Sequence, residues 1–110
     1  MDTNYVIQLF ADFISRSDPN ILKYLINYNI DLHEAYPDSF PKPHVVNFFI
    51  NLLGLDRKTI DELLTTDNLL SIIKDSNVEI YNLLKEENGL KWLNRQVSVI
   101  KNYYLDKQKI

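Results

Sequence analysis

The chain has 110 residues, of which 45% are hydrophobic and 25% charged, and its formal net charge at pH 7 is −3. This length and apolar fraction predict one folded domain and exclude an intrinsically disordered chain. The absence of cysteine excludes disulfides, thiolate metal sites and cysteine catalysis.

The sequence also lacks the signals of membrane or secretory targeting. No apolar run is long enough to span a bilayer, and no basic segment followed by an apolar run opens the chain. We therefore expect a cytoplasmic protein that does not bind membranes. The negative net charge argues against general electrostatic attraction to nucleic acid.

The first predicted helix begins after Asp2 or Thr3. Its apolar residues recur at the spacing of one helix face, which indicates a single stripe against a core. The stripe consists of Val6, Leu9, Phe10, Phe13 and Ile14.

The second predicted helix starts at Pro19, with Asp18 as its N-cap, and runs to about Tyr28. Its apolar side is predicted to consist of Ile21, Leu22, Leu25 and Ile26.

A short helical turn through Ala35 follows, because Asp31 and Glu34 have capping-box spacing. Residues 36–42 are proline-rich and predict a loop. We expect its aromatic residues, Tyr36 and Phe40, to pack onto the core.

A longer helix is predicted from Pro43, with Gly54 as its C′ residue. Two shorter helices should follow, one capped by Asp56 and the next by Thr66. Their predicted apolar residues are Ile60, Leu63 and Leu64 in the first, and Leu69, Leu70, Ile72 and Ile73 in the second.

Another capping box, Ser76 with Glu79, predicts a helix that buries Ile80, Leu83 and Leu84 and stops at Gly89. The last helix is predicted over residues 90–105. Helical signals of this kind, with short connections and almost no strand signal, predict an all-α fold. We expect a compact single-domain bundle of six to seven short helices over residues 1–105, with residues 106–110 as a frayed tail.

Charge is distributed unevenly along the chain. Residues 91–110 hold five basic residues and one acidic residue, a net charge of +4, whereas residues 1–90 hold seven basic and fourteen acidic residues, a net charge of −7. The basic end segment could hold a phosphate backbone or an acidic partner. The candidate partner- or nucleic-acid-binding residues are therefore Lys91, Arg95, Lys101, Tyr103, Lys107 and Lys109.

The opposite face of the last helix is apolar, and it is formed by Leu93, Val97, Ile100 and Tyr104. Trp92, Val99 and Tyr103 widen this face to about half of the circumference. Such a face is typical of a helix that packs on a bundle, and its width also allows self-association.

Residues 97–104 resemble the peptide with which replication proteins dock on sliding clamps. In that family a glutamine precedes an aliphatic residue and a pair of aromatic residues. Ile100, Tyr103 and Tyr104 occupy the aliphatic and aromatic positions, whereas Val97 stands at the glutamine position and Gln96 lies one place early. The resemblance implies a docking peptide at the end of the last helix.

Helix-turn-helix DNA binding is a further interpretation of residues 56–74. Asp67 would then face phosphates at the start of the recognition helix, which is unfavourable, and the usual turn glycine is missing. Two helices packed in the core are the favoured interpretation of this segment.

The sequence shows no catalytic constellation, and we expect no enzyme, no metal and no cofactor. His33 and His44 lack further ligands at the spacing of a metal site, and two glycines cannot build a phosphate-binding loop.

The leading hypothesis is a non-enzymatic helical accessory protein that binds a larger protein partner. The first alternative is a nucleic-acid-binding bundle in replication or transcription that uses the basic C-terminal helix. The second is an inhibitor or immunity protein with an acidic, nucleic-acid-mimicking surface.

Overall fold

The computed structural model describes residues 5–36, 54 and 57–102, and within these ranges every regular element is a helix. This confirms the prediction of an all-α fold for the described part of the chain. The helices are α1 (Tyr5–Ser15), α2 (Pro19–Tyr28), α3 (Leu32–Ala35), α5 (Arg57–Leu63), α6 (Thr66–Ser76), α7 (Val78–Lys85) and α8 (Glu87–Ile100).

Some predicted features lie outside the described residues. These are the packing of Phe40, the helix from Pro43, the cap at Asp56, and the chain after residue 102. Gly54 itself is described, and its φ of 66° lies in the left-handed region that a C′ glycine adopts.

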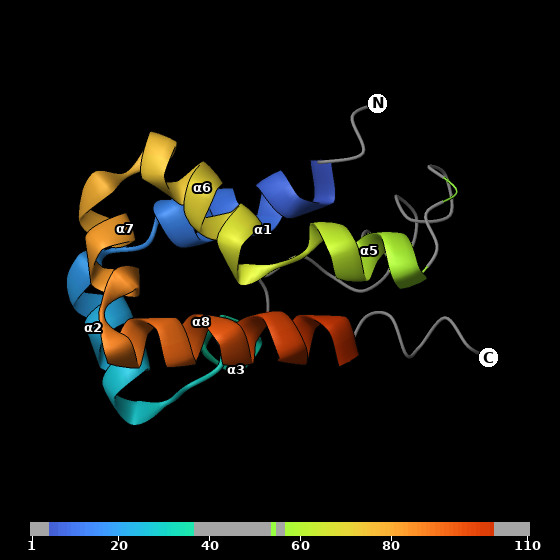
Figure 1. The fold of residues 1–110 in the computed structure, drawn as a ribbon. Coiled ribbons are helices and arrows are strands. Elements are labelled where there is room, and N and C mark those ends of the chain that lie inside the picture. Colours follow the sequence, from blue (N-terminus) through green and yellow to red (C-terminus); the bar gives the residue numbers. More distant parts are fainter. Residues whose placement is uncertain (1–4, 37–53, 55–56, 103–110) are drawn as a thin grey trace.

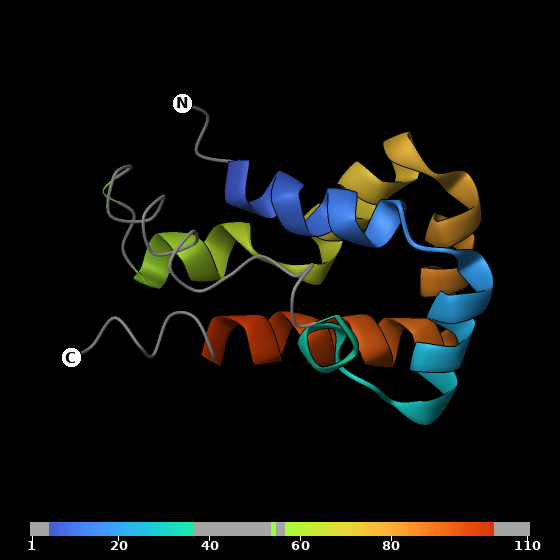
Figure 2. The ribbon, with the colours of Figure 1, turned by 180° about the vertical axis from the view of Figure 1, so that it is seen from behind.

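The helices form two layers joined at one end. In Figure 1, α8 runs along one side of the molecule, while α1 and α6 pack against each other on the opposite side. Both α2 and α7 lie at the same end and contact each other and α8. Seen from behind in Figure 2, α3 lies across α8.

One hydrophobic core fills the space between the layers, and every described helix contributes to it. Its buried members include Phe10 of α1, Leu22 of α2, Leu69 of α6 and Leu93 of α8, each at most 1% exposed. This arrangement explains the helical periodicity of the sequence, because each amphipathic helix turns its apolar stripe toward this core.

The first two helices form as predicted, but their buried faces differ in part. In α1, Ile7 and Ala11 are buried without having been predicted, whereas Leu9 and Phe13 are only half-buried. Phe10 and Ile14 of the predicted α1 stripe are buried. In α2 the Asp18 carboxylate accepts hydrogen bonds from the amides of Asn20 at 2.7 Å and Ile21 at 3.4 Å, which confirms the cap. The prediction that Ile21 belongs to the core is wrong, since its side chain is 45% exposed.

Two predicted N-caps are wrong by one residue. Thr65, not Thr66, caps α6 by accepting from the amide of Asn68. Asn77, not Ser76, caps α7 by accepting from the amide of Ile80. Thr65 and Asn77 have the extended backbone that a cap requires, whereas the residues chosen from the sequence already belong to α6.

Gly89 does not end a helix, which corrects the prediction from its residue type. α7 ends at Lys85, and Gly89 lies buried in the first turn of α8. A Cβ atom at this position would collide with the carbonyl oxygen of Leu83 and lie 2.8 Å from the Cα of Leu84. The glycine is needed because the start of α8 packs directly on the backbone at the end of α7.

Candidate functional site

The aromatic and aliphatic residues on the apolar face of α8 pack in the core. Trp92, Val97 and Ile100 are at most 7% exposed. The indole Nε1 of Trp92 donates a hydrogen bond to the carbonyl oxygen of Ile30 at 2.9 Å. These side chains are therefore not available to stack on bases, and two positions of the clamp-like motif are buried.

A polar network joins α8 to the segment around α3. The buried carboxylate of Asp31 accepts hydrogen bonds from Nε of Arg95 and from Nε2 of Gln96, each at 3.0 Å. The Oε1 atom of Gln96 in turn accepts from the backbone amide of Leu32 at 2.9 Å. Asp31 is the N-cap residue of α3 but forms no side-chain cap bond, so the predicted capping box with Glu34 is not formed.

Arg95 is therefore part of a structural contact and is not a free surface cation. The hydrogen bond from Arg95 to Asp31, together with the negative charge of that carboxylate, raises the pKa of the Arg95 guanidinium above its ordinary value. The side chain of Arg95 is 49% exposed, whereas that of Asp31 is 5% exposed. Because Asp31 already pairs with the Arg95 guanidinium, less of its positive charge is available to a binding partner.

The other two predicted cations in the described residues also have acidic partners. Lys91 lies 3.3 Å from the carboxylate of Glu87 one turn earlier, in a pair that is exposed on both sides. Lys101 lies 3.7 Å from the Asp61 carboxylate and donates to the Asp61 carbonyl oxygen at 3.3 Å. Lys101 thereby links α8 to α5.

We call Lys91, Arg95 and Lys101 the basic strip. All three lie on or next to α8, as predicted, and each is paired with a carboxylate of the same chain. Pairing lowers the electrostatic gain of binding a phosphate, because a partner must compete with the internal carboxylate. Tyr103, Lys107 and Lys109, the other candidate site residues, lie outside the described residues.

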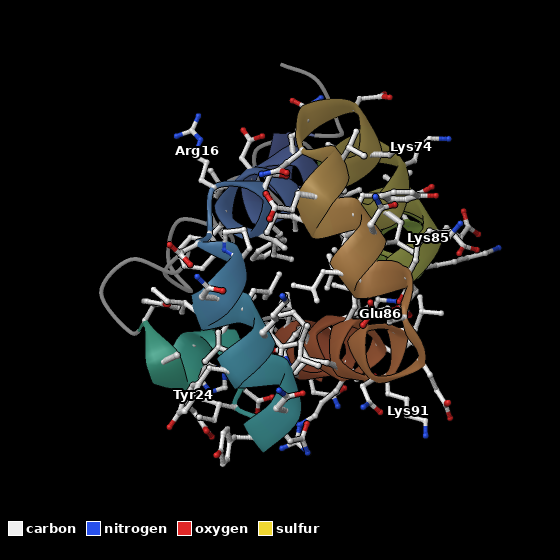
Figure 3. All side chains as sticks on the ribbon, turned by 90° about the vertical axis from the view of Figure 1, so that its left-hand side faces the viewer. Arg16, Tyr24, Lys74, Lys85, Glu86 and Lys91 are labelled. Atoms are coloured by element: carbon white, nitrogen blue, oxygen red, sulfur yellow. The ribbon has the colours of Figure 1, made fainter. Side chains whose placement is uncertain are left out.

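A different surface stands out on α2, which runs along the end of the molecule. The side chains of Ile21, Tyr24 and Tyr28 are 45%, 54% and 68% exposed, and we call them the α2 aromatic face. The two tyrosine rings contact each other with their centroids 4.7 Å apart. Figure 3 shows Tyr24 projecting from α2 at the edge of the molecule.

This face carries little charge. Lys23 is the only charged residue within α2, and the remaining exposed polar residues of the helix are the asparagines Asn20 and Asn27. The α2 aromatic face therefore combines large apolar side chains with amides, in a chain of which a quarter of the residues are charged.

Sequence reasoning missed this surface, although a signal was present. Ile21, Tyr24 and Tyr28 are spaced by three and four residues, so they form a second stripe on the same short helix. Helical periodicity alone assigns Ile21 to the core side together with Leu22, so the sequence does not separate the two stripes. Two stripes on one helix indicate that one of them has no partner within the bundle.

Two surface hollows border these elements. One, of about 640 Å³, lies beside α1 and has Phe13 and Tyr36 in its lining with Asp12, Arg16 and Asp18. The rings of Phe13 and Tyr36 are in edge-to-face contact at 5.7 Å. The other, of about 370 Å³, lies between the end of α2 and the start of α8 and is lined by Ile26, Asn27, Asn29, Asn88, Lys91, Trp92 and Arg95. Their mixed linings indicate no particular reaction chemistry.

No group of three or more histidine, cysteine, aspartate or glutamate residues in the described ranges could hold a metal ion. No helix of those ranges has the length and apolar character needed to cross a bilayer.

Comparison of the chain with protein-family models, with curated proteins and with solved structures found no match in any of the three.

Proposed function

We propose that this protein is a non-enzymatic interaction protein that binds a larger protein through the α2 aromatic face. The observation that carries the proposal is the exposed pair Tyr24 and Tyr28, whose rings contact each other, with Ile21 beside it. Tyrosine is enriched at the energetic centres of protein interfaces, because its ring buries a large area at a small entropic cost.

The low charge of the face supports a protein partner of a particular kind. Interface cores are depleted of charged residues, and the face has Lys23 as its only charged neighbour within α2. A complementary partner would offer an apolar, uncharged patch, with backbone or side-chain groups that hydrogen-bond to the tyrosine hydroxyls and the neighbouring asparagines. A phosphate backbone does not fit such a face, because there is almost no positive charge to neutralise it.

The pairing within the basic strip also favours this face over α8. Arg95 holds the buried Asp31, and Lys101 joins two helices, so both contribute to the fold. Neither Tyr24 nor Tyr28 is part of the hydrophobic core, and their rings contact each other. A binding role accounts for two aromatic side chains that are exposed and lie side by side.

The test is affinity purification from the cells that produce the protein, followed by mass spectrometry. The double variant Tyr24→Ala with Tyr28→Ala should lose a partner protein that the unchanged chain retains. With the purified partner, the variant should bind about 30-fold more weakly, the effect of losing an interface hot spot.

The matched control is Tyr24→Phe with Tyr28→Phe, which keeps both rings and should keep most of the binding. Thermal unfolding of all variants should remain close to that of the unchanged protein, because the substituted residues are exposed. If the alanine variant retrieves the same partners at the same affinity, the α2 aromatic face is not the interface and the proposal fails.

A further inference from the structure

A second surface with a distinct chemistry lies on the other side of the molecule from Tyr24. The ammonium groups of Lys74 and Lys85 lie 5.7 Å and 5.3 Å from the centroid of the same ring, that of Tyr81. We call these three residues the lysine–tyrosine cluster. Figure 3 shows Lys74 and Lys85 along one edge and Tyr24 at the opposite edge.

The two lysines differ from the residues of the basic strip because no carboxylate of the described residues forms an ion pair with them. Within the described ranges no ion pair involves Lys74 or Lys85, whereas Lys91, Arg95 and Lys101 each have one. Their near neighbours Asp75, Glu79 and Glu86 are exposed but do not form ion pairs with them. Two positive charges held at one ring are therefore available to an anionic group from outside.

The positions of the lysines explain why the arrangement is stable without carboxylates. Lys74 is in the last turn of α6 and Lys85 is in the last turn of α7. The partial negative charge at a helix C-terminus stabilises a cation there, and the tyrosine ring adds a cation–π attraction. Tyr81 is half-buried against the core, so it provides a fixed platform for both side chains.

Apolar surface adjoins the charge. Val78, which is 61% exposed, shares the outer face of α7 with Tyr81 and Lys85 at a spacing of three and seven residues. A partner at this site would therefore meet a hydrophobic contact beside two unpaired ammonium groups. This combination is complementary to a protein segment that carries both carboxylates and apolar side chains.

We propose that the lysine–tyrosine cluster binds an acidic, partly apolar segment of a protein partner. This site adds a second contact, of stated chemistry, to the proposed function. It rests on that function only because it requires a protein partner. A nucleic acid fits less well, since two lysines can neutralise only a few phosphates. The Tyr81 ring also already holds two ammonium groups and is not free to stack on a base.

The experiment measures fluorescence anisotropy at low ionic strength with three labelled probes. They are a peptide rich in glutamate and leucine, the same peptide with glutamine in place of every glutamate, and a single-stranded oligothymidine. The acidic peptide should bind, and the variant Lys74→Gln with Lys85→Gln should bind it about tenfold more weakly, as expected for the loss of two ion pairs.

The control is Arg16→Gln with Lys58→Gln, which removes the same charge from two exposed basic residues elsewhere and should change the affinity by less than about twofold. A second variant, Tyr81→Leu, removes the ring and should weaken binding about threefold. The fold of each variant is checked by the fluorescence of Trp92, which is 2% exposed in the core.

The possible results separate this inference from the proposed function. Equal binding by the Lys74/Lys85 and Arg16/Lys58 variants, or no peptide binding up to about 1 mM, overturns the inference. Tighter binding of oligothymidine than of the acidic peptide overturns it in favour of a nucleic acid. If the tyrosine variants of α2 lose their partner while the lysine variants bind the peptide normally, only the inference fails.

Discussion

At the scale of single residues, Gln96 shows how a polar side chain can hold a small bundle together. It is 2% exposed, and its amide bridges the buried Asp31 carboxylate and the backbone amide of Leu32. Gln96 and Asp31 lie 65 residues apart in sequence, so the contact closes a long loop. Every buried side-chain nitrogen or oxygen in the described ranges has a hydrogen-bond partner, which is the condition for a buried network to stabilise the fold.

We predict that Gln96→Leu lowers the free energy of unfolding by about 2–3 kcal/mol, although leucine adds apolar area. The amide of Leu32 loses its acceptor and the Asp31 carboxylate loses one donor, and buried groups without partners are costly. Urea unfolding would measure the change. Ser98→Leu, an exposed position on the same helix, is the control and should shift the free energy by less than about 0.5 kcal/mol. A similar loss in both variants would contradict the structural role of Gln96.

Gly89 shows that one residue type can be required for two different structural reasons. A glycine near a helix end usually marks the C′ position, and the same residue type is also required where two backbones touch. The second reason applies here, because the first turn of α8 contacts the carbonyl oxygen of Leu83 and the Cα of Leu84. Residue type alone does not distinguish these two uses.

At the scale of elements, the caps decide where each helix begins and how it meets its neighbour. Asn77 caps α7 through its Oδ1 atom, and its Nδ2 atom donates to the carbonyl oxygen of Ser15 at 3.0 Å. One side chain therefore both starts α7 and ties it to the end of α1. Ser76, the cap expected from the sequence, donates back to Ile72 within α6.

We predict that Asn77→Ala destabilises the fold by about 2 kcal/mol, because it removes a cap and a contact between helices. Ser76→Ala should cost less than about 0.5 kcal/mol, since its hydroxyl is exposed and bonds only within its own helix. Thermal or urea unfolding of the two neighbouring alanine variants gives the comparison directly. Equal destabilisation, or a larger effect at Ser76, would show that the cap assignment is wrong.

The α2 aromatic face and the lysine–tyrosine cluster also follow from the make-up of individual helices. Each arises because a short helix carries more large side chains than one buried stripe can hold. In α2 the surplus is Ile21, Tyr24 and Tyr28, and on the outer face of α7 it is Val78 with Tyr81. Both helices lie at the same end of the bundle (Figure 1), where their outer faces are not covered by another described helix.

At the scale of the whole molecule, the described helices share one core, and this predicts cooperative unfolding. Trp92, the only tryptophan, is 2% exposed and bonds to Ile30, so its fluorescence reports on the contact between α8 and the segment after α2. We expect the unfolding transitions followed by Trp92 fluorescence and by far-ultraviolet circular dichroism to coincide, as in a two-state domain.

Denaturant titration followed by both signals is the measurement. Separate midpoints would contradict the single core and would mean that α1 and α6 unfold independently of α8. A coincident transition that shifts with Gln96→Leu in both signals would further support the role of the network across the two layers.

The proposed sites were harder to predict than the fold. The periodicity of apolar residues predicted most helices within a few positions, because amphipathic spacing is a local property of the chain. The site prediction relied on charge counted along the sequence, and Lys91, Arg95 and Lys101 then proved to be paired. Two of their partners, Asp31 and Asp61, are 64 and 40 residues away, so no local pattern reveals them.

By itself, the sequence determined the all-α class, the Asp18 cap with Pro19, and the apolar stripe of α6, since each depends on residues within one or two helical turns. The tertiary structure alone decided which stripe of α2 entered the core, which lysines kept their charge available, and why Gly89 is a glycine. Those outcomes depend on which helices become neighbours. Burial and ion pairing are properties of surfaces brought together from distant parts of the chain.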